Sequence, residues 1–175
     1  CPKYSLTLDK EMTAYTGPVT LVQLSACILG DKNRMSYDAW ISYIKNVLEA
    51  TKTLLKNPND LDTRSIIMMG ASLSTSSRLG IGKEEAYAYD IYELEFLPEK
   101  LFGSSYRRSL TSIFPRFLEA MGKRHKEDVR KYYLDVFGFD SSIEESSRKL
   151  VALFSDFGVD MYYDGIINRE QVGCI

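Results

Sequence analysis

Apolar side chains between residues 36 and 56 recur at the spacing of one helix face, and this stripe constrains the fold more than any other feature of the sequence. The stripe consists of Trp40, Ile44, Val47, Leu48, Leu54 and Leu55. Residues three and four positions apart share one side of an α-helix, so the segment predicts an amphipathic helix that packs on a core. Pro58 is the expected end, and Trp40 is expected to be a core residue because it lies on the stripe.

Two further segments predict helices. An apolar run between residues 17 and 30 contains Pro18 at a suitable first helical position and ends at Gly30. Ser142 and Glu145 have the spacing of a capping box, and an apolar stripe follows them. That stripe consists of Leu150, Leu153, Phe154 and Phe157, with Gly158 as the expected stop.

Residues 104–121 also have apolar side chains at helical spacing, but Pro115 lies among them. Proline lacks a backbone N–H, and its ring clashes with the preceding helical turn. Two arrangements stay open: two short helices, or an irregular stretch followed by a helix that begins near Pro115.

Four segments have patterns typical of β-strands. Residues 4–13 alternate between apolar and polar side chains, and residues 65–69 form a short apolar run. Residues 86–96 fit a long strand with a bulge near Ile91, and residues 129–139 are rich in aromatic and β-branched side chains. Strands of this kind predict a sheet with one face on the core.

Residues 159–171 have two interpretations. Asp164 and Gly165 form the residue pair that a two-residue type I′ turn prefers, which predicts a β-hairpin. The same segment also resembles a calcium loop that begins at Asp160. Gln171 stands where such a loop has its bidentate Glu, so calcium would bind poorly, and the hairpin is favoured.

Together these segments predict an α+β fold: a single compact domain with an antiparallel sheet packed against several helices, and a C-terminal helix followed by a β-hairpin. The length of 175 residues suits one domain over residues 1–175. Because the chain begins with Cys1 instead of Met, we expect that a native N-terminal tail is missing.

Charged side chains are separated into blocks. Residues 84–99 contain six acids and no base, residues 100–131 contain nine bases and three acids, and residues 132–175 contain eight acids and three bases. Such patches suit contact with a charged partner or with another copy of the chain. The residues predicted to bind an anionic partner are Arg107, Arg108, Arg116, Lys123, Arg124, Lys126, Arg130 and Lys131. The alternative is a solvated face that pairs with the acidic blocks.

Signs of catalysis are few. His125 is the single histidine, and no sequence signature supports a serine or cysteine nucleophile beside it. Gly80, Gly82 and Lys83 do not form a phosphate loop, because the required Gly and Ser or Thr are missing around them. The sequence therefore predicts a protein that is not an enzyme and that uses no cofactor and no metal ion.

Four strings of the sequence carry a resemblance to a viral family. They are KYSLTLDKEMTAYTGP, EAYAYDIYELEFLPEKL, VRKYYLDVFGF and SRKLVALFSDFGVDMYYDG. In order and pattern they resemble a rhabdovirus matrix protein, and the size is similar to that of a plant-infecting member. Animal members tend to be basic and to carry a PPxY budding motif, whereas this chain has a net charge of −2 and no such motif.

The resemblance implies a viral structural protein that self-associates and links the nucleocapsid to the envelope membrane in assembly and budding. The implied partners are the chain itself as a homo-oligomer, the viral nucleocapsid and an anionic membrane surface, with no sequence-specific nucleic acid. The implied locations are the virion, the host cytoplasm and the inner membrane surface. The alternative is a host or viral adaptor module with a degenerate calcium-type loop at 160–171.

Overall fold

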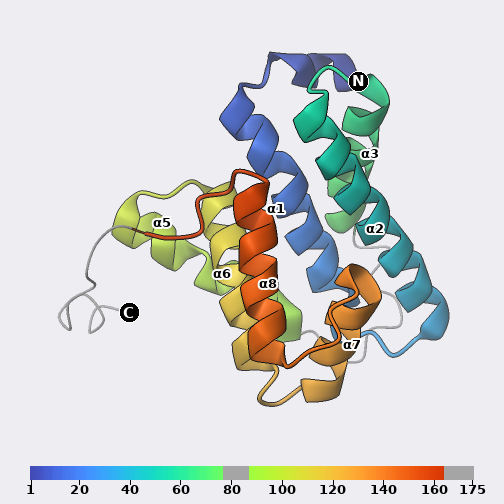
Figure 1. Cartoon of the computed structure of the whole chain (residues 1–175), viewed down its shortest axis with the longest axis vertical. Coiled ribbons are helices and arrows are strands. Elements are labelled where there is room, and N and C mark those ends of the chain that lie inside the picture. Colours follow the sequence, from blue (N-terminus) through green and yellow to red (C-terminus); the bar gives the residue numbers. More distant parts are fainter. Residues whose placement is uncertain (77–86, 164–175) are drawn as a thin grey trace.

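The computed structural model describes residues 1–76 and 87–163, and Figure 1 shows how the elements are arranged. In this part of the chain the regular elements are helices, and no β-strand occurs. Two are 3-10 helices, η1 (Pro2–Thr7) and η3 (Tyr87–Asp90). The α-helices are α1 (Lys10–Ile28), α2 (Arg34–Lys56), α3 (Leu61–Ser74), α4 (Ile91–Leu94), α5 (Phe96–Phe102), α6 (Tyr106–Met121), α7 (Lys126–Phe137) and α8 (Ile143–Asp156).

Helix α1 lies in the middle of the molecule. It packs against α2, α3 and α6, and Figure 1 shows it between the α2–α3 pair and the α6–α8 pair. Its buried residues surround the helix and include the consecutive pair Leu21 and Val22 as well as Leu24 and Ala26. A helix that is apolar on all sides has to be covered by other elements, which explains its central place.

The close contact between α1 and α2 depends on Gly17. A Cβ atom at this position would lie 2.1 Å from Oγ1 of Thr51 on α2, so a larger residue would push the two helices apart. The helix start predicted here is wrong, because α1 already begins at Lys10 after Asp9 caps it by accepting a hydrogen bond from a backbone N–H. Pro18 therefore lies inside the helix.

The α+β prediction is wrong for the described residues, because every predicted strand that falls within them is helical. Residues 4–13 form η1 and the start of α1, and residues 65–69 lie in α3. No antiparallel sheet is therefore present in the described part of the chain. Helix α8 is followed by irregular chain up to residue 163, and the turn of the predicted hairpin lies outside the described residues, as does most of the alternative calcium loop.

Helix α7 shows why a strand was the wrong interpretation. Its aromatic and β-branched composition is typical of strands, yet the buried residues are Val129, Tyr132, Tyr133 and Val136. Their spacing of three, one and three positions is that of a single helix face. The same holds from η3 to α5, where Ala88, Ile91 and Glu95 are buried at intervals of three and four.

The two amphipathic helices with clear start signals are confirmed. The 36–56 segment is the main part of α2, which begins two residues earlier because Asn33 accepts hydrogen bonds from two backbone N–H groups. Trp40 is buried in the core, as predicted. Ser142 caps α8 by accepting a hydrogen bond from the backbone N–H of Glu145 at 3.2 Å.

Helix α6 runs through Pro115 without interruption, so both arrangements predicted for this segment are wrong. The proline is buried, and its carbonyl oxygen accepts a hydrogen bond from Oγ of Ser147 on α8 at 2.8 Å. Ser147 in turn shares a hydrogen bond of 2.9 Å with the hydroxyl of Tyr133 on α7. This polar chain joins α6, α7 and α8 around the proline.

A membrane-spanning helix needs about 20 mainly apolar residues. None of the helices within residues 1–76 and 87–163 combines sufficient length with sufficient apolar character.

Candidate functional site

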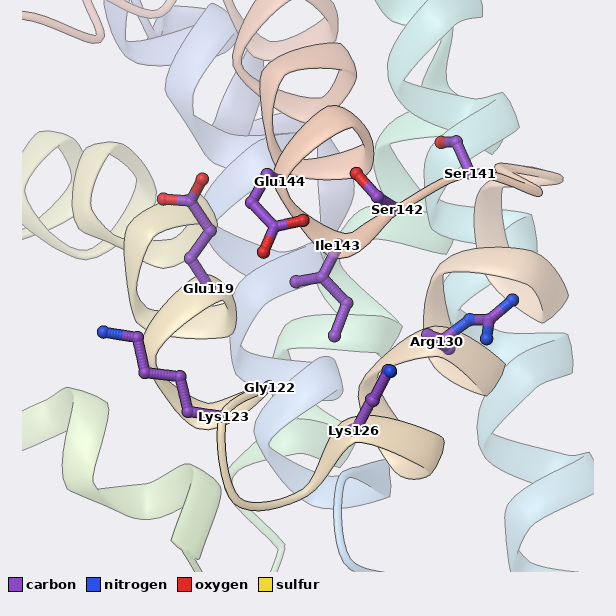
Figure 2. Close-up of a pocket in the computed structure, with 9 residues that line it drawn as sticks. All are labelled: Glu119, Gly122, Lys123, Lys126, Arg130, Ser141, Ser142, Ile143 and Glu144. Atoms are coloured by element: carbon purple, nitrogen blue, oxygen red, sulfur yellow. The ribbon is translucent and has the colours of Figure 1, made fainter.

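Three of the eight predicted anion-binding residues lie around one pocket. Lys123 follows α6, and Lys126 and Arg130 lie on the first turns of α7 (Figure 2). The pocket has a volume of about 560 Å³, and we call it the basic pocket. Its other lining residues are Glu119, Gly122, Ser141, Ser142, Ile143 and Glu144.

Positive charge in the basic pocket is partly balanced. The pKa of Glu144 is lowered by a hydrogen bond to its own backbone N–H, by Ser142 and by nearby positive charge. In Figure 2 the side chains of Lys123 and Arg130 point outward on opposite sides. No ion pair among the described residues involves Lys123, Lys126 or Arg130. Their role in anion binding therefore stays a prediction.

Two of the other predicted basic residues lie at the start of α6 and contact its neighbours. Arg108 forms an ion pair with Asp160, and its guanidinium carbon lies 4.5 Å from the centre of the Tyr163 ring. Nη1 of Arg107 lies 3.6 Å from Sδ of Met12 on α1. Both side chains therefore hold elements of the fold together.

The last three predicted basic residues, Arg116, Arg124 and Lys131, have other neighbours. Arg116 forms an ion pair of 2.6 Å with Glu119, and Lys131 forms one of 2.6 Å with Asp135. Arg124 lines a neighbouring pocket together with His125 and Lys126, and Lys126 also lines the basic pocket. The eight residues thus lie at several places in the structure, and their role in binding an anionic partner stays a prediction.

A second group of polar side chains, which the sequence analysis did not identify, lies where α1, η3, α4 and α6 meet. We call it the tyrosine cluster, and it consists of Gln23, Cys27, Tyr89, Tyr92 and Tyr106. Nε2 of Gln23 donates a hydrogen bond of 3.3 Å to the hydroxyl of Tyr106. Oγ of Ser74 on α3 donates one of 3.4 Å to Oε1 of Gln23, which orients the amide.

Two phenols of the tyrosine cluster, Tyr89 and Tyr92, have raised pKa values. Burial raises the pKa of Tyr92 far above its ordinary value, and the neighbouring Tyr106, Cys27 and Tyr89 raise it further. Burial also raises the pKa of Tyr89, with a smaller contribution from Cys27. An uncharged phenol can both donate and accept a hydrogen bond. Tyr89 and Tyr106 are each 39% exposed, so part of each side chain faces solvent.

Glu95 lies one helical turn after Tyr92 and is an unusual residue. It is 3% exposed, and its Oε2 atom has no hydrogen-bond partner within residues 1–76 and 87–163. Burial raises the pKa of this carboxyl group, and the nearby Glu99 raises it further. An unpaired buried carboxyl group costs free energy, which is why such groups occur more often at functional sites than elsewhere.

The sequence contained one signal that points to the tyrosine cluster. Tyrosine is abundant, with 12 copies, and Tyr87, Tyr89 and Tyr92 are close together within the acidic segment 84–99. The sequence analysis predicted a strand with a bulge near Ile91 for this segment, whereas the tyrosines lie on η3 and α4. Gln23 and Tyr106 are 83 positions apart, and no local pattern could bring them together.

Comparison with known proteins relates the fold to dehydrogenases. No family model and no curated protein matches the chain. Among solved structures, the NADH-dependent butanol dehydrogenase A from Thermotoga maritima is similar with a TM-score of 0.81 and 16% identity, over 90% of this chain and 41% of that one. The aldehyde reductase YqhD from E. coli is similar with a TM-score of 0.79 and 17% identity, over 92% of this chain and 44% of that one.

A second structure of E. coli YqhD gives a TM-score of 0.82 at 16% identity, over 92% of this chain and 43% of that one. The chain therefore spans less than half the length of the structures it matches. At these identities the likeness establishes the fold, which is that of the helical C-terminal domain of alcohol dehydrogenase-like proteins.

This fold overturns the viral interpretation. The resemblance to a rhabdovirus matrix protein is wrong, because the similar structures belong to the iron-type alcohol dehydrogenase family. The matrix function, the partners implied with it and the location in a virion and at an inner membrane surface lose their support. The prediction that the protein is not an enzyme is contradicted as well, since the matched folds are those of enzymes.

The iron-type family implies a metal ion, and the described residues do not fit one. Within residues 1–76 and 87–163 no three His, Cys, Asp or Glu side chains are close enough to share a metal ion. The sequence has one histidine, and the His125 ring is stacked on Tyr87 with the ring centres 3.9 Å apart. The tyrosine cluster offers phenols, an amide and one thiol, which suit hydrogen bonding better than iron.

One similar protein, the butanol dehydrogenase, is named for its use of NADH, so we also asked which described residues could hold that cofactor. A dinucleotide is usually held by a glycine-rich turn between a strand and a helix. Glycines in the described residues are isolated from one another, and the segment 80–83 lies outside the described residues. We therefore assign none of the described residues to NADH.

Proposed function

We propose that this chain is the helical domain of a dehydrogenase-type enzyme that interconverts a small alcohol and its carbonyl compound. The observation that carries the proposal is the extent of the fold likeness, a TM-score of about 0.8 over at least 90% of the chain. The similar proteins are named for butanol and for aldehydes, which are neutral molecules with one reactive oxygen atom.

The tyrosine cluster is the part of the fold that suits such a ligand. Alcohol and carbonyl oxygen atoms accept hydrogen bonds, and the hydroxyl of Tyr106 and the amide of Gln23 can supply them. The rings of Tyr89 and Tyr92, whose centres are 6.2 Å apart, offer apolar surface beside these donors. A short aliphatic alcohol has the same combination of one polar end and an apolar tail.

The proposal is tested by turnover. The purified protein is mixed with reduced nicotinamide nucleotide and a series of short aldehydes, and the absorbance of the reduced nucleotide is followed. We expect consumption with butanal and a drop of about 10²-fold or more in the rate for Tyr106→Phe, because one donor to the developing oxyanion is lost.

The matched control is Tyr37→Phe, which removes a phenol hydroxyl from the contact between α2 and α7. It should leave the rate within about two-fold of the unchanged protein, because it lies outside the tyrosine cluster. Failure to turn over any aldehyde or alcohol with either nicotinamide nucleotide would contradict the proposed function. Equal losses of rate in the two variants would show that the tyrosine cluster is not the site of the reaction.

A further inference from the structure

Three helix ends meet at the basic pocket. The end of α6, the first turns of α7 and the start of α8 supply residues that line it. Gly122 allows this close approach, because a Cβ atom there would lie 2.6 Å from Cδ1 of Ile143 on α8. Both residues are buried, and the polar side chains of the pocket stand around them (Figure 2). The basic pocket therefore has a fixed apolar base with longer charged side chains at its rim.

Positive charge is in excess at this rim. The bases that line the basic pocket are Lys123, Lys126 and Arg130. Within residues 1–76 and 87–163 no ion pair involves any of the three. Of the two acids that line the pocket, Glu119 is already paired with Arg116 at 2.6 Å, so among the lining residues Glu144 alone opposes the three bases.

The three bases can act on one ligand. In Figure 2 the Lys126 side chain points toward Ile143, between the outward-pointing Lys123 and Arg130. All three bases are exposed, and their side chains have several rotatable bonds, so they can turn toward an anion that lies over Ile143. The chain as a whole has a net charge of −2, so it attracts an anion only where bases are gathered locally.

Glu144 holds the place that an anion would take. Its carboxylate accepts hydrogen bonds from its own backbone N–H and from Ser142, and these bonds lower its pKa most. The positive charges of Arg148 and Lys126 lower the pKa further. Glu144 is exposed, so its side chain can turn outward without leaving a cavity. A ligand with two negative charges gains more from the bases than one carboxylate does.

The size and the donors of the basic pocket suit a small phosphate compound. Its volume of about 560 Å³ is in the usual range of ligand pockets. A phosphate group carries nearly two negative charges at neutral pH and has three oxygen atoms that accept hydrogen bonds strongly. Lysine binds such a group as a point charge, and arginine offers it two parallel donors.

We propose that the basic pocket binds a phosphate group, as the free ion or on a small organic compound, through Lys123, Lys126 and Arg130, and that this group displaces the carboxylate of Glu144. This inference goes beyond the proposed function and does not depend on it. The residues that line the basic pocket include none of the tyrosine cluster. It gives one part of the basic segment 100–131 a role in binding.

The test compares ligands that differ in charge. The purified chain is titrated with glucose 6-phosphate, glucose and inorganic phosphate at constant ionic strength. Calorimetry gives the affinity, and backbone amide signals in NMR spectra locate the ligand. We expect glucose 6-phosphate to bind and to shift the signals of Gly122 and Glu144, and glucose to do neither. Tighter binding of glucose 6-phosphate than of inorganic phosphate supports an organic phosphate as the ligand, and equal binding supports the free ion.

Variants identify the groups responsible. Lys126→Gln should weaken the binding of glucose 6-phosphate about 10-fold, the equivalent of one hydrogen bond to a charged group. Lys56→Gln is the matched control, since Lys56 is an exposed lysine at the end of α2 that does not line the pocket. Glu144→Gln should strengthen binding about three-fold or more, because a neutral amide competes less with phosphate. A damaged fold cannot produce this gain in affinity.

Three results would overturn phosphate binding at the basic pocket. The first is that neither phosphate compound binds at millimolar concentration. The second is an equal loss of affinity in Lys126→Gln and Lys56→Gln, which would indicate general attraction by positive charge. The third is a Glu144→Gln variant that does not bind phosphate more tightly. A chain that binds phosphate but turns over no aldehyde or alcohol would support this inference and contradict the proposed function.

Discussion

Tyrosines occur in two kinds of surroundings in this protein. Tyr132 and Tyr133 on α7 are each 1% exposed, and their hydroxyls share hydrogen bonds with Oγ of Ser25 at 2.6 Å and Oγ of Ser147 at 2.9 Å. In the tyrosine cluster, Tyr106 is 39% exposed, and its hydrogen bond to Gln23 is longer, at 3.3 Å.

The difference shows how one residue type serves two purposes. A phenol that is enclosed with a fixed partner stabilises the fold, because its ring is buried and its hydroxyl stays paired. A phenol at the edge of the core, with a longer and exposed hydrogen bond, can exchange its partner for a ligand. Burial and pairing, rather than residue type, therefore distinguish the structural tyrosines from the candidate functional ones.

Removing a whole tyrosine ring is expected to give the largest difference in unfolding free energy between the structural tyrosines and the tyrosine cluster. Tyr132→Ala should lower the free energy of unfolding by about 3–5 kcal/mol, because it leaves a cavity among α1, α6 and α7. Tyr106→Ala should cost about 1 kcal/mol, since much of its ring is already exposed. Urea unfolding measures both values. Equal losses would show that the tyrosine cluster is part of the structural core.

A smaller loss of stability is expected from weakening the contact between Tyr37 and Asp135. Tyr37 is a third structural tyrosine, and its hydroxyl donates a hydrogen bond of 2.9 Å to Asp135. Burial alone would raise the pKa of Asp135, but hydrogen bonds from Lys131 and Tyr37 outweigh it, so the pKa is lowered. A lowered pKa stabilises the fold at pH values above the ordinary carboxyl pKa, and this contribution is lost as the pH falls through the folded-state value.

Asp135→Asn should therefore cost about 1 kcal/mol at neutral pH and progressively less below about pH 4. Unfolding curves across this pH range provide the measurement. A cost that stays constant down to about pH 2 would mean that the charge of Asp135 does not stabilise the α2–α7 contact.

The smallest change in stability is expected from replacing Glu95, which follows Tyr92 of the tyrosine cluster by three positions. Burial and Glu99 raise the pKa of this carboxyl group, so the sign is opposite to that of Asp135. Stability from the protonated form is complete below the ordinary carboxyl pKa and is lost as the pH rises through the folded-state value. Glu95→Gln should match the unchanged protein near pH 4 and be the more stable of the two at neutral pH. A destabilised variant at neutral pH would show that the Glu95 carboxylate has a structural partner.

Several features of this protein followed from local sequence. The stripe of α2 and the capping box of α8 predicted their helices because side chains three and four positions apart, with a polar cap, fit no other regular structure. The acidic and basic blocks were also evident, although their partners were not.

Other features depended on the tertiary structure. Segments such as 129–139 are short and aromatic, and a core that surrounds α1 makes them helices where composition alone favours strands. The tyrosine cluster joins Gln23 to Tyr106 across 83 positions, and bases from one sequence block, such as Arg108, Arg116 and Lys131, face different neighbours. Local periodicity fixes which face of an element is apolar, whereas packing fixes which elements meet, and a site made from four elements exists only once they have met.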